Sequence, residues 1–269
     1  MWQTLSRGGT LPTTPTTLAH PTRQAPTATP APSQQQQQQR ITLLPSERWL
    51  YCGKTGTGKS YLARHNLRTL AAKGWRVVIV DPEGFWCGKR PRWERSGPGT
   101  VDKPRLVTAR FDPRLAVQLY IPARPAYRDE GLMRLCLDAM TLGGVIVYFD
   151  EVYGTADHNR INEGVLEVWT QGRKHDVGGW VSVQRPARIP EYYLSQAENW
   201  AVFNVPGDAD RKRLAAYSAT PAIVDVRLPE RYWWYWHQST MDHAQLMQPL
   251  DTGEPATPGT SAVVRRTSS

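Results

Sequence analysis

The sequence predicts an α/β fold in which a mostly parallel central sheet is flanked by helices. Between residues 41 and 246, short apolar runs alternate with stretches of helical periodicity. This alternation is typical of parallel strands joined by helices. A glycine-rich loop of the kind that holds phosphate groups connects the first apolar run to the first helical stretch. Both ends of the chain are rich in proline and threonine, so the ordered region is expected between them.

Apolar periodicity gives the expected elements in order along the chain. The expected strands are residues 49–52, 77–80, 145–149, 180–183 and 200–205. The expected helices are residues 61–73, 131–140, 161–173 and 209–216. Residues 105–121 look more like an extended hairpin excursion than like part of the core sheet. The basic residues 211–213 are expected on the exposed face of the last helix.

Three regions follow from this pattern. Residues 1–40 form a Thr/Pro/Gln-rich arm that ends in a run of glutamines at 34–39. Such a composition buries too little apolar surface to offset the chain entropy, so we expect this arm to be disordered. Residues 247–269 are expected to form a second flexible tail. The remaining segment, residues 41–246, is the expected catalytic domain.

Residues 53–60 (GKTGTGKS) match GxxxxGK[ST], a pattern whose backbone N–H groups, lysine and hydroxyl surround nucleotide phosphates. In this interpretation Lys59 reaches the β- and γ-phosphates, and the Ser60 hydroxyl binds Mg²⁺. The helix that starts at Tyr61 directs its positive end at the phosphates. The alternative is a glycine-rich turn with an incidental lysine. The expected nucleotide ligands are Gly53, Lys54, Thr55, Gly56, Thr57, Gly58, Lys59, Ser60 and Tyr61.

An apolar strand that ends in two carboxylates, residues 145–151 (VIVYFDE), predicts the acidic half of the site. Asp150 is expected to hold Mg²⁺ through a water molecule, and Glu151 to polarise the water that attacks the γ-phosphate. The alternative is a strand that merely ends in solvated acids. Asp81 ends another expected strand, and it either supports Mg²⁺ or caps a loop.

Two further polar residues are candidates for the hydrolytic site. Gln184 follows a strand, and its amide is able to sense the γ-phosphate or to orient the attacking water. Arg173 is a candidate arginine finger, a cation that stabilises the transition state on a neighbouring subunit. The alternative for Arg173 is a charge that complements the end of a helix, and Arg185 is the second candidate finger.

The order of these segments resembles the FtsK–HerA superfamily of DNA-pumping ATPases. The resemblance lies within residues 45–240, in GKTGTGKS at 53–60, DPEG at 81–84, YFDE at 148–151, GRKHDVGGWVSVQRP at 172–186 and VFNVPGDADRKRL at 202–214. The short core is most similar to the genome-packaging ATPases of tailless double-stranded DNA viruses with an internal membrane. Unlike many members of the superfamily, the chain shows no long insertion with an obvious basic DNA loop.

The resemblance implies a RecA-like (ASCE) P-loop NTPase fold and a homo-oligomeric ring of about five or six subunits. It also implies ATP hydrolysis with Mg²⁺ that drives double-stranded DNA through a central pore. By position, Lys59 and Ser60 become nucleotide ligands, and Asp150 and Glu151 become the acidic pair. Gln184 becomes the sensor of the γ-phosphate, and Arg173 the arginine finger.

The composition agrees with a polyanionic partner. The formal net charge of +9 favours nucleic acid or an acidic membrane surface. Cys52, Cys87 and Cys136 lack the spacing of a zinc site or a disulfide framework, which fits a reducing intracellular compartment. The apolar runs are too short to cross a bilayer. The resemblance further implies the host cytoplasm or a virion vertex as the location, with a capsid or vertex protein as a further partner.

The motifs do not assign the residues that contact DNA. The best local candidate is the basic stretch 89–95 (KRPRWER), and the loop 124–128 is a weaker one. Both have a solvated surface loop as the alternative. The aromatic run 232–236 (YWWYW) predicts a strand that is buried on both sides or docked on a neighbouring subunit, with base stacking as the alternative.

Together the residues predict an ATPase that moves double-stranded DNA, most simply a viral genome into its capsid. A conjugation or filamentous-phage assembly ATPase is the nearest alternative, although these usually bring transmembrane segments. A nucleotide-dependent DNA- or capsid-binding scaffold would not need the water-activating Glu151. A P-loop kinase would need a lid and an acceptor site, and its turnover would be indifferent to DNA.

Overall fold

A computed structural model describes residues 41–84, 86, 98–108, 110–152, 156–157 and 160–250 of the 269-residue chain. The expected disordered arm, residues 1–40, lies outside the described residues, and so do residues 251–269 of the expected tail. The basic stretch 89–95 also lies outside them. The expected domain boundaries therefore stay predictions.

A nine-stranded sheet forms the centre of the described part, in the order β11-β10-β9-β1-β8-β5-β2-β4-β3. The strands are β1 Trp49–Cys52, β2 Arg76–Val80, β3 Arg105–Val107, β4 Val117–Tyr120, β5 Val145–Phe149, β8 Val177–Val183, β9 Asn199–Val202, β10 Trp233–His237 and β11 Gln245–Met247. From β9 to β3 all neighbours are parallel, and β10 and β11 are antiparallel. A separate antiparallel pair joins β6 Ala156–Asp157 to β7 Arg160–Ile161.

The position of β8 in the strand order identifies the fold class. β8 lies between β1, which enters the glycine-rich loop, and β5, which ends in the two carboxylates. Since both neighbours are parallel to β8, the carboxyl ends of all three strands meet at one edge. This inserted strand is the arrangement of a RecA-like P-loop fold, as the sequence predicts.

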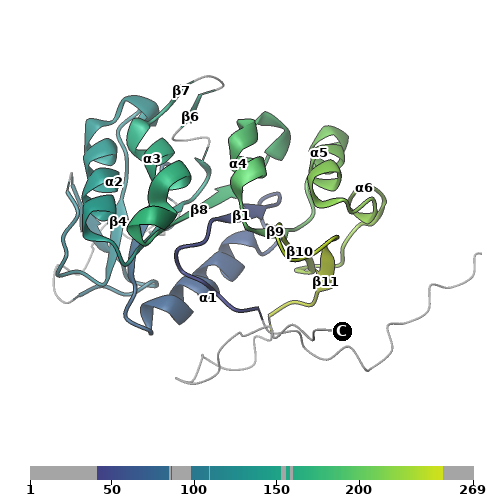
Figure 1. Cartoon of the computed structure of the whole chain (residues 1–269), viewed down its shortest axis with the longest axis horizontal. Helices are drawn as coiled ribbons and strands as arrows, with labels where there is room; N and C mark the ends of the chain where they lie inside the picture. The colour runs from purple at the N-terminus through teal and green to yellow at the C-terminus, as the bar shows by residue number, and fades with distance from the viewer. Residues whose placement is uncertain are drawn as a thin grey trace, which may run out of the picture. The chain divides into compact units, whose positions relative to one another are not determined.

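Helices cover the two faces unequally (Figure 1). The α-helices are α1 Lys59–Ala71, α2 Glu130–Leu142, α3 Glu163–Gln171, α4 Glu191–Gln196, α5 Asp208–Ser218 and α6 Ala222–Asp225. Short 3₁₀ turns are η1 Ala126–Arg128, η3 Gly172–His175 and η4 Pro186–Arg188. α1 packs on one face, and α2 to α6 pack on the other. Within the described residues, no helix combines the length and the apolarity needed to span a membrane.

Aromatic side chains fill the face that α1 covers. Trp49 of β1 stacks on Tyr51 with ring centroids 5.5 Å apart, and on Tyr235 of β10 at 6.0 Å. Trp180 of β8 lies 5.6 Å from Trp49. Large rings bury much area per residue, so a single helix and these rings suffice to close this face.

The aromatic strand β10 is packed on both sides, as expected from its sequence. Trp233 and Tyr235 lie in the core on the α1 side, whereas Trp236 lies in the core on the opposite side. Trp236 meets Trp200 of β9 in an edge-to-face contact with centroids 5.1 Å apart. These buried rings are not available for base stacking.

The expected hairpin in residues 105–121 is wrong. The two strands of this segment, β3 and β4, are parallel, and β4 pairs with β2 inside the main sheet. The buried side chain of Gln118 holds the connection between the two strands. Its amide accepts from the N–H of Asp112 at 2.8 Å and donates to the carbonyl of Asp112 at 2.9 Å. The connection is thereby folded back against β4, and β3 extends the sheet beyond β4.

The expected exposure of residues 211–213 is also wrong for two of the three. Arg211 is buried and pairs with Asp208, one turn earlier in α5. Arg213 donates to the carbonyls of Pro186 and Ile189 at 3.0 and 2.9 Å, which ties α5 to η4. Both guanidinium groups therefore serve helix packing, and only Lys212 is exposed.

Candidate active site

The glycine-rich loop lies at the carboxyl end of β1, where two neighbouring strands anchor it. The N–H of Gly53 donates to the carbonyl of Val183, the last residue of β8, at 3.1 Å. The N–H of Lys54 donates to the carbonyl of Asn204, just beyond β9, at 2.9 Å. The first residues of the loop are therefore fixed before α1 begins.

Two glycines of the loop are required for different reasons. At Gly53 an added Cβ would lie 2.8 Å from both Phe203 Cβ and Thr57 Oγ1. At Gly58 the backbone has a φ of 105°, a left-handed conformation that favours glycine. Thr57 closes the loop from within by donating its hydroxyl to the carbonyl of Lys54 at 2.8 Å.

The amino-terminal end of α1 favours the binding of an anion. Lys59 is its first residue and is buried, with 7% of its surface exposed. The first turn contains no acidic residue, so the helix N–H groups and dipole favour negative charge beside this lysine. Ser60 follows in the same turn. Tyr61 is 44% exposed, so its ring is accessible at the surface.

Asp150 lies at the end of β5 and is held by two hydroxyl groups. Its Oδ1 accepts from the hydroxyl of Tyr148 at 2.9 Å and from that of Ser182 at 3.2 Å. The N–H of Asp150 donates to the carbonyl of Val80 in β2 at 2.9 Å. Among the described residues no hydrogen bond reaches Oδ2, so one oxygen is positioned and the other is left for a ligand.

Glu151 has a strained backbone and a buried carboxylate. Its φ is 60°, in the left-handed region that a residue with a side chain enters at a cost of about 1–3 kcal/mol. Both of its carboxylate oxygens are buried, and in the described part of the chain no hydrogen bond of ordinary geometry reaches them. Burial raises the pKa of Glu151, while the Lys59 ammonium and the backbone and side chain of Gln184 lie close enough to oppose this rise. A candidate base therefore lies near the lysine of the loop.

Gln184 joins the loop to this acid. It follows β8, between β1 and β5, and its Oε1 accepts from the hydroxyl of Thr55 at 3.1 Å. Its effect on the pKa of Glu151 places the same amide next to the acid. The Gln184 side chain therefore contacts both the phosphate-binding loop and the candidate base Glu151.

Asp81 and Asp210 support neighbouring loops. The buried Asp81 accepts from the N–H of Trp86 at 2.5 Å, which favours the loop-capping interpretation. Asp210 of α5 is fully buried, and it accepts from Arg185 Nε at 2.9 Å and from the N–H of Ala187 at 2.8 Å. No sequence signal marks Asp210, because an acid in the first turn of a helix is too common to indicate a site.

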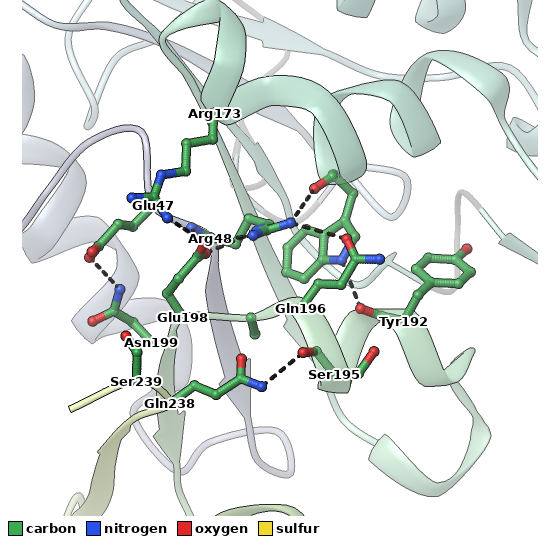
Figure 2. A network of polar contacts seen from close by, with 12 residues as sticks. Glu47, Arg48, Arg173, Tyr192, Ser195, Gln196, Glu198, Asn199, Gln238 and Ser239 are labelled. Carbon is green, nitrogen blue, oxygen red and sulfur yellow. Dashed lines mark hydrogen bonds and ion pairs between the residues drawn. The ribbon is translucent and has the colours of Figure 1, made fainter. Parts of the chain in front are cut away.

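Arg173 lies away from these residues. It belongs to η3, which precedes β8, whereas Gln184 follows β8. The length of the seven-residue strand separates the two by roughly 20 Å. Figure 2 shows Arg173 beside Glu47, Arg48 and Glu198 at the opposite edge of the sheet. The structure therefore does not bring Arg173 to the loop of its own chain.

The network around Arg173 is structural. Arg48 makes a two-pronged ion pair with Glu198, with 2.5 Å from Nη2 to Oε1 and 2.9 Å from Nε to Oε2. It also donates to Gln196 Oε1 at 3.0 Å (Figure 2). Arg173 adds only a 3.4 Å contact to Glu198, and its side chain is 64% exposed. An exposed arginine with one long contact is available to another molecule.

The residues at the carboxyl edge fit a magnesium ion. Mg²⁺ commonly takes one or two protein oxygens, with waters and phosphate oxygens completing its coordination. Asp150 Oδ2 and the Ser60 hydroxyl supply two such oxygens. Within the described residues, no group of three or more His, Cys, Asp or Glu side chains forms a metal site of its own. A metal here would therefore arrive together with a phosphate ligand.

Comparison with known proteins gives one relative by sequence. The chain is 24% identical, over 174 residues, to the DNA packaging ATPase P9 of Enterobacteria phage PRD1. The aligned part covers 64% of this chain and 70% of that protein. No family model matches the sequence.

Solved structures share the fold. The genome packaging NTPase B204 of Sulfolobus turreted icosahedral virus 2, in complex with AMPPCP, matches with a TM-score of 0.61 and 16% identity. The match covers 77% of this chain and 100% of that one. The pCW3 conjugation coupling protein TcpA matches with a TM-score of 0.55 and 15% identity, over 76% of this chain and 60% of that one. The expected P-loop fold and the resemblance to viral genome-packaging ATPases are confirmed.

Proposed function

We propose that this chain is an ATP-hydrolysing translocase of double-stranded DNA that packages a viral genome into its capsid. The similarity to two viral packaging ATPases supports the biological task. The observation that carries the enzymatic part is the buried carboxylate of Glu151, which lies near the Lys59 ammonium and the Gln184 amide. A module that only binds nucleotide has no need of such a base.

In this proposal the loop binds the triphosphate of ATP. The N–H groups of residues 53–60 and the positive end of α1 surround the phosphates, and Lys59 neutralises part of their charge. Ser60 and Asp150 hold Mg²⁺, with Asp150 oriented by Tyr148 and Ser182. When bound, the ion supplies positive charge that stabilises the transferring phosphoryl group.

Glu151 orients and polarises the attacking water. Its raised pKa brings the carboxylate closer to the range in which a general base is effective at neutral pH. Gln184 contacts Thr55 of the loop and lowers the pKa of Glu151. A change in the loop on nucleotide binding would therefore alter the contact between Gln184 and the base. The strained backbone of Glu151 positions its carboxylate, which is a common use of strain at catalytic sites.

Assembly completes the site in this proposal. Because Arg173 lies at the far edge of its own sheet, it is able to act only on the nucleotide of another copy. A homo-oligomeric ring of about five or six subunits would supply that contact. Hydrolysis would then depend on assembly, and a fully active monomer would exclude the role of Arg173.

Double-stranded DNA is the proposed substrate of the movement. The net charge of +9 supplies an electrostatic contribution to binding. The loop 124–128 lies beyond the carboxyl end of β4, at the edge of the sheet that carries the phosphate-binding loop. This loop and the stretch 89–95 remain the candidate DNA contacts. The proposed place of action is a virion vertex, reached from the host cytoplasm.

DNA transfer in conjugation is the second candidate function. The fold match to a conjugation coupling protein supports it. The sequence match to a phage packaging ATPase favours packaging instead, because it covers 70% of that protein.

Steady-state ATP hydrolysis with and without long double-stranded DNA tests the proposal. We expect DNA to stimulate hydrolysis, and we expect this stimulation to fall as the salt concentration rises. Glu151→Gln serves as the hydrolysis-deficient control. Turnover that is indifferent to DNA would favour another NTPase activity, and nucleotide binding without turnover would favour a scaffold.

A further inference from the structure

The segment between α6 and β10 is fastened to the phosphate-binding loop by Asn204. The Asn204 side chain donates to the carbonyl of Leu228 at 2.8 Å and accepts from the N–H of Leu228 at 3.0 Å. The carbonyl of Asn204 accepts from the N–H of Lys54 in the loop. One residue thus fixes residues 228–231 relative to the loop.

Arg231 occupies a strained position in this segment. The N–H of Tyr232 donates to the carbonyl of Pro229 at 3.2 Å, which makes Arg231 the third residue of a turn. Its φ is 63°, and glycine or asparagine is the usual choice at such a position. A long cationic side chain that is kept in this backbone conformation points to a function for that side chain.

The side chain of Arg231 passes close to the last glycine of the loop. A Cβ added to Gly58 would lie 3.6 Å from Arg231 Cγ and 3.7 Å from Arg231 Cβ. The Arg231 side chain is 53% exposed. Among the described residues its one ion pair is with the adjacent Glu230, at 3.5 Å, and the Glu230 side chain is 81% exposed. Exposed pairs of this kind bind weakly, so the guanidinium is available to a ligand.

The two ends of the loop face different parts of a nucleotide. Thr55 meets Gln184 on the side of the candidate base Glu151, which is the side of the γ-phosphate in the proposed function. Gly58 precedes Lys59 at the start of α1, on the side of β9 and the 228–231 segment. The Arg231 side chain therefore begins beside Gly58, on the β9 side of the loop, whereas Gln184 approaches the loop from the β8 side.

We propose that Arg231 binds the α- and β-phosphates of the nucleotide held by the same chain. This inference rests on the proposed nucleotide-binding function. The planar guanidinium forms paired, charge-assisted hydrogen bonds with phosphate oxygens. ATP and ADP both carry the α- and β-phosphates, so this contact contributes to the affinity for either nucleotide.

Titration with fluorescent ATP and ADP analogues at fixed Mg²⁺ tests this role. We expect Arg231→Ala to weaken the binding of both nucleotides by roughly tenfold, and Arg231→Lys to restore part of the loss. Arg227→Ala is the matched control, since Arg227 is an exposed arginine of the same segment. We expect Arg227→Ala to bind both nucleotides as the unaltered chain does.

Arg231→Gly separates binding from folding. Glycine adopts a φ of 63° without strain, so we expect an unchanged or higher melting temperature together with weaker nucleotide binding. A residue with a purely structural role would not give these opposite effects. Unchanged affinity in Arg231→Gly and Arg231→Ala would overturn the inference, and so would a loss confined to ATP. An unaltered chain that binds neither nucleotide would contradict the proposed function itself.

Discussion

Glu151, the proposed base, has buried carboxylate oxygens that no hydrogen bond of ordinary geometry reaches among the described residues. The folded chain holds a proton on this carboxyl more tightly than the unfolded chain does, because burial raises its pKa. Ionised Glu151 therefore lowers the stability of the folded state above the ordinary carboxyl pKa of about 4.3. That cost disappears as the pH falls below this value.

Glu151→Gln should separate stability from activity. We expect hydrolysis to fall by at least about 100-fold while nucleotide affinity is kept. At pH 7 to 8 the melting temperature should rise by roughly 2–4 °C, because a buried charge is removed. This gain should shrink toward pH 4. Melting curves across this pH range provide the measurement, with the exposed Glu167→Gln as control; an increase that is independent of pH would contradict the burial argument.

The hydroxyl of Ser182, on the neighbouring strand β8, helps to orient Asp150, the proposed magnesium ligand. Ser182→Ala leaves Asp150 in place but removes one of the two hydroxyls that hold it. We expect the Mg²⁺ concentration for half-maximal hydrolysis to rise by about tenfold. The rate at saturating Mg²⁺ should recover. Ser195→Ala, at an exposed serine, should have no effect, and an unchanged Mg²⁺ requirement in Ser182→Ala would sink the assignment.

At the scale of elements, the end of β8 depends on α5. Asp210 of α5 holds both Arg185 and the N–H of Ala187, immediately after the proposed sensor Gln184. We expect Asp210→Asn to lower kcat by roughly tenfold with little change in nucleotide affinity, because it loosens the sensor and not the loop. The exposed Asp225→Asn, in the neighbouring helix α6, provides the control. A variant that loses affinity but keeps kcat would contradict this role.

The connection between β3 and β4 is predicted to matter for stability alone. Gln118→Leu removes both hydrogen bonds to the backbone of Asp112 and leaves its N–H without that partner, while its carbonyl still accepts from the N–H of Leu115 at 3.1 Å. We expect a cost of about 1–3 kcal/mol in the free energy of unfolding. Chemical denaturation measures this cost. Nucleotide affinity should not change, since β4 lies beyond β2 and β5 from the loop.

Local patterns predicted the elements that depend on neighbours in sequence. The loop and its helix follow from residues 53–60, and the bounds of β1 and β5 follow from their apolar runs. The parallel pairing of β3 was missed because no apolar pattern reveals the course of the connection to β4, which Gln118 holds through the backbone of Asp112. Asp210 and Arg231 were missed because their contacts with Arg185 and Gly58 arise only from folding.

At the scale of the whole molecule, the sheet order brings the loop, the acids and Gln184 to one edge, while Arg173 lies at the other. A subunit built in this way presents a nucleotide at one edge and an exposed arginine at the opposite edge. Stacking of identical copies in a closed ring would unite the two. This arrangement gives a physical reason why hydrolysis and movement would require assembly.

Displacement of a third strand from double-stranded DNA tests the central claim most directly. A labelled oligonucleotide bound as a triplex is released only when a motor moves along the duplex beneath it. The account predicts release that requires ATP and Mg²⁺ and that is abolished in Glu151→Gln. DNA-stimulated hydrolysis without release of the third strand would contradict translocation.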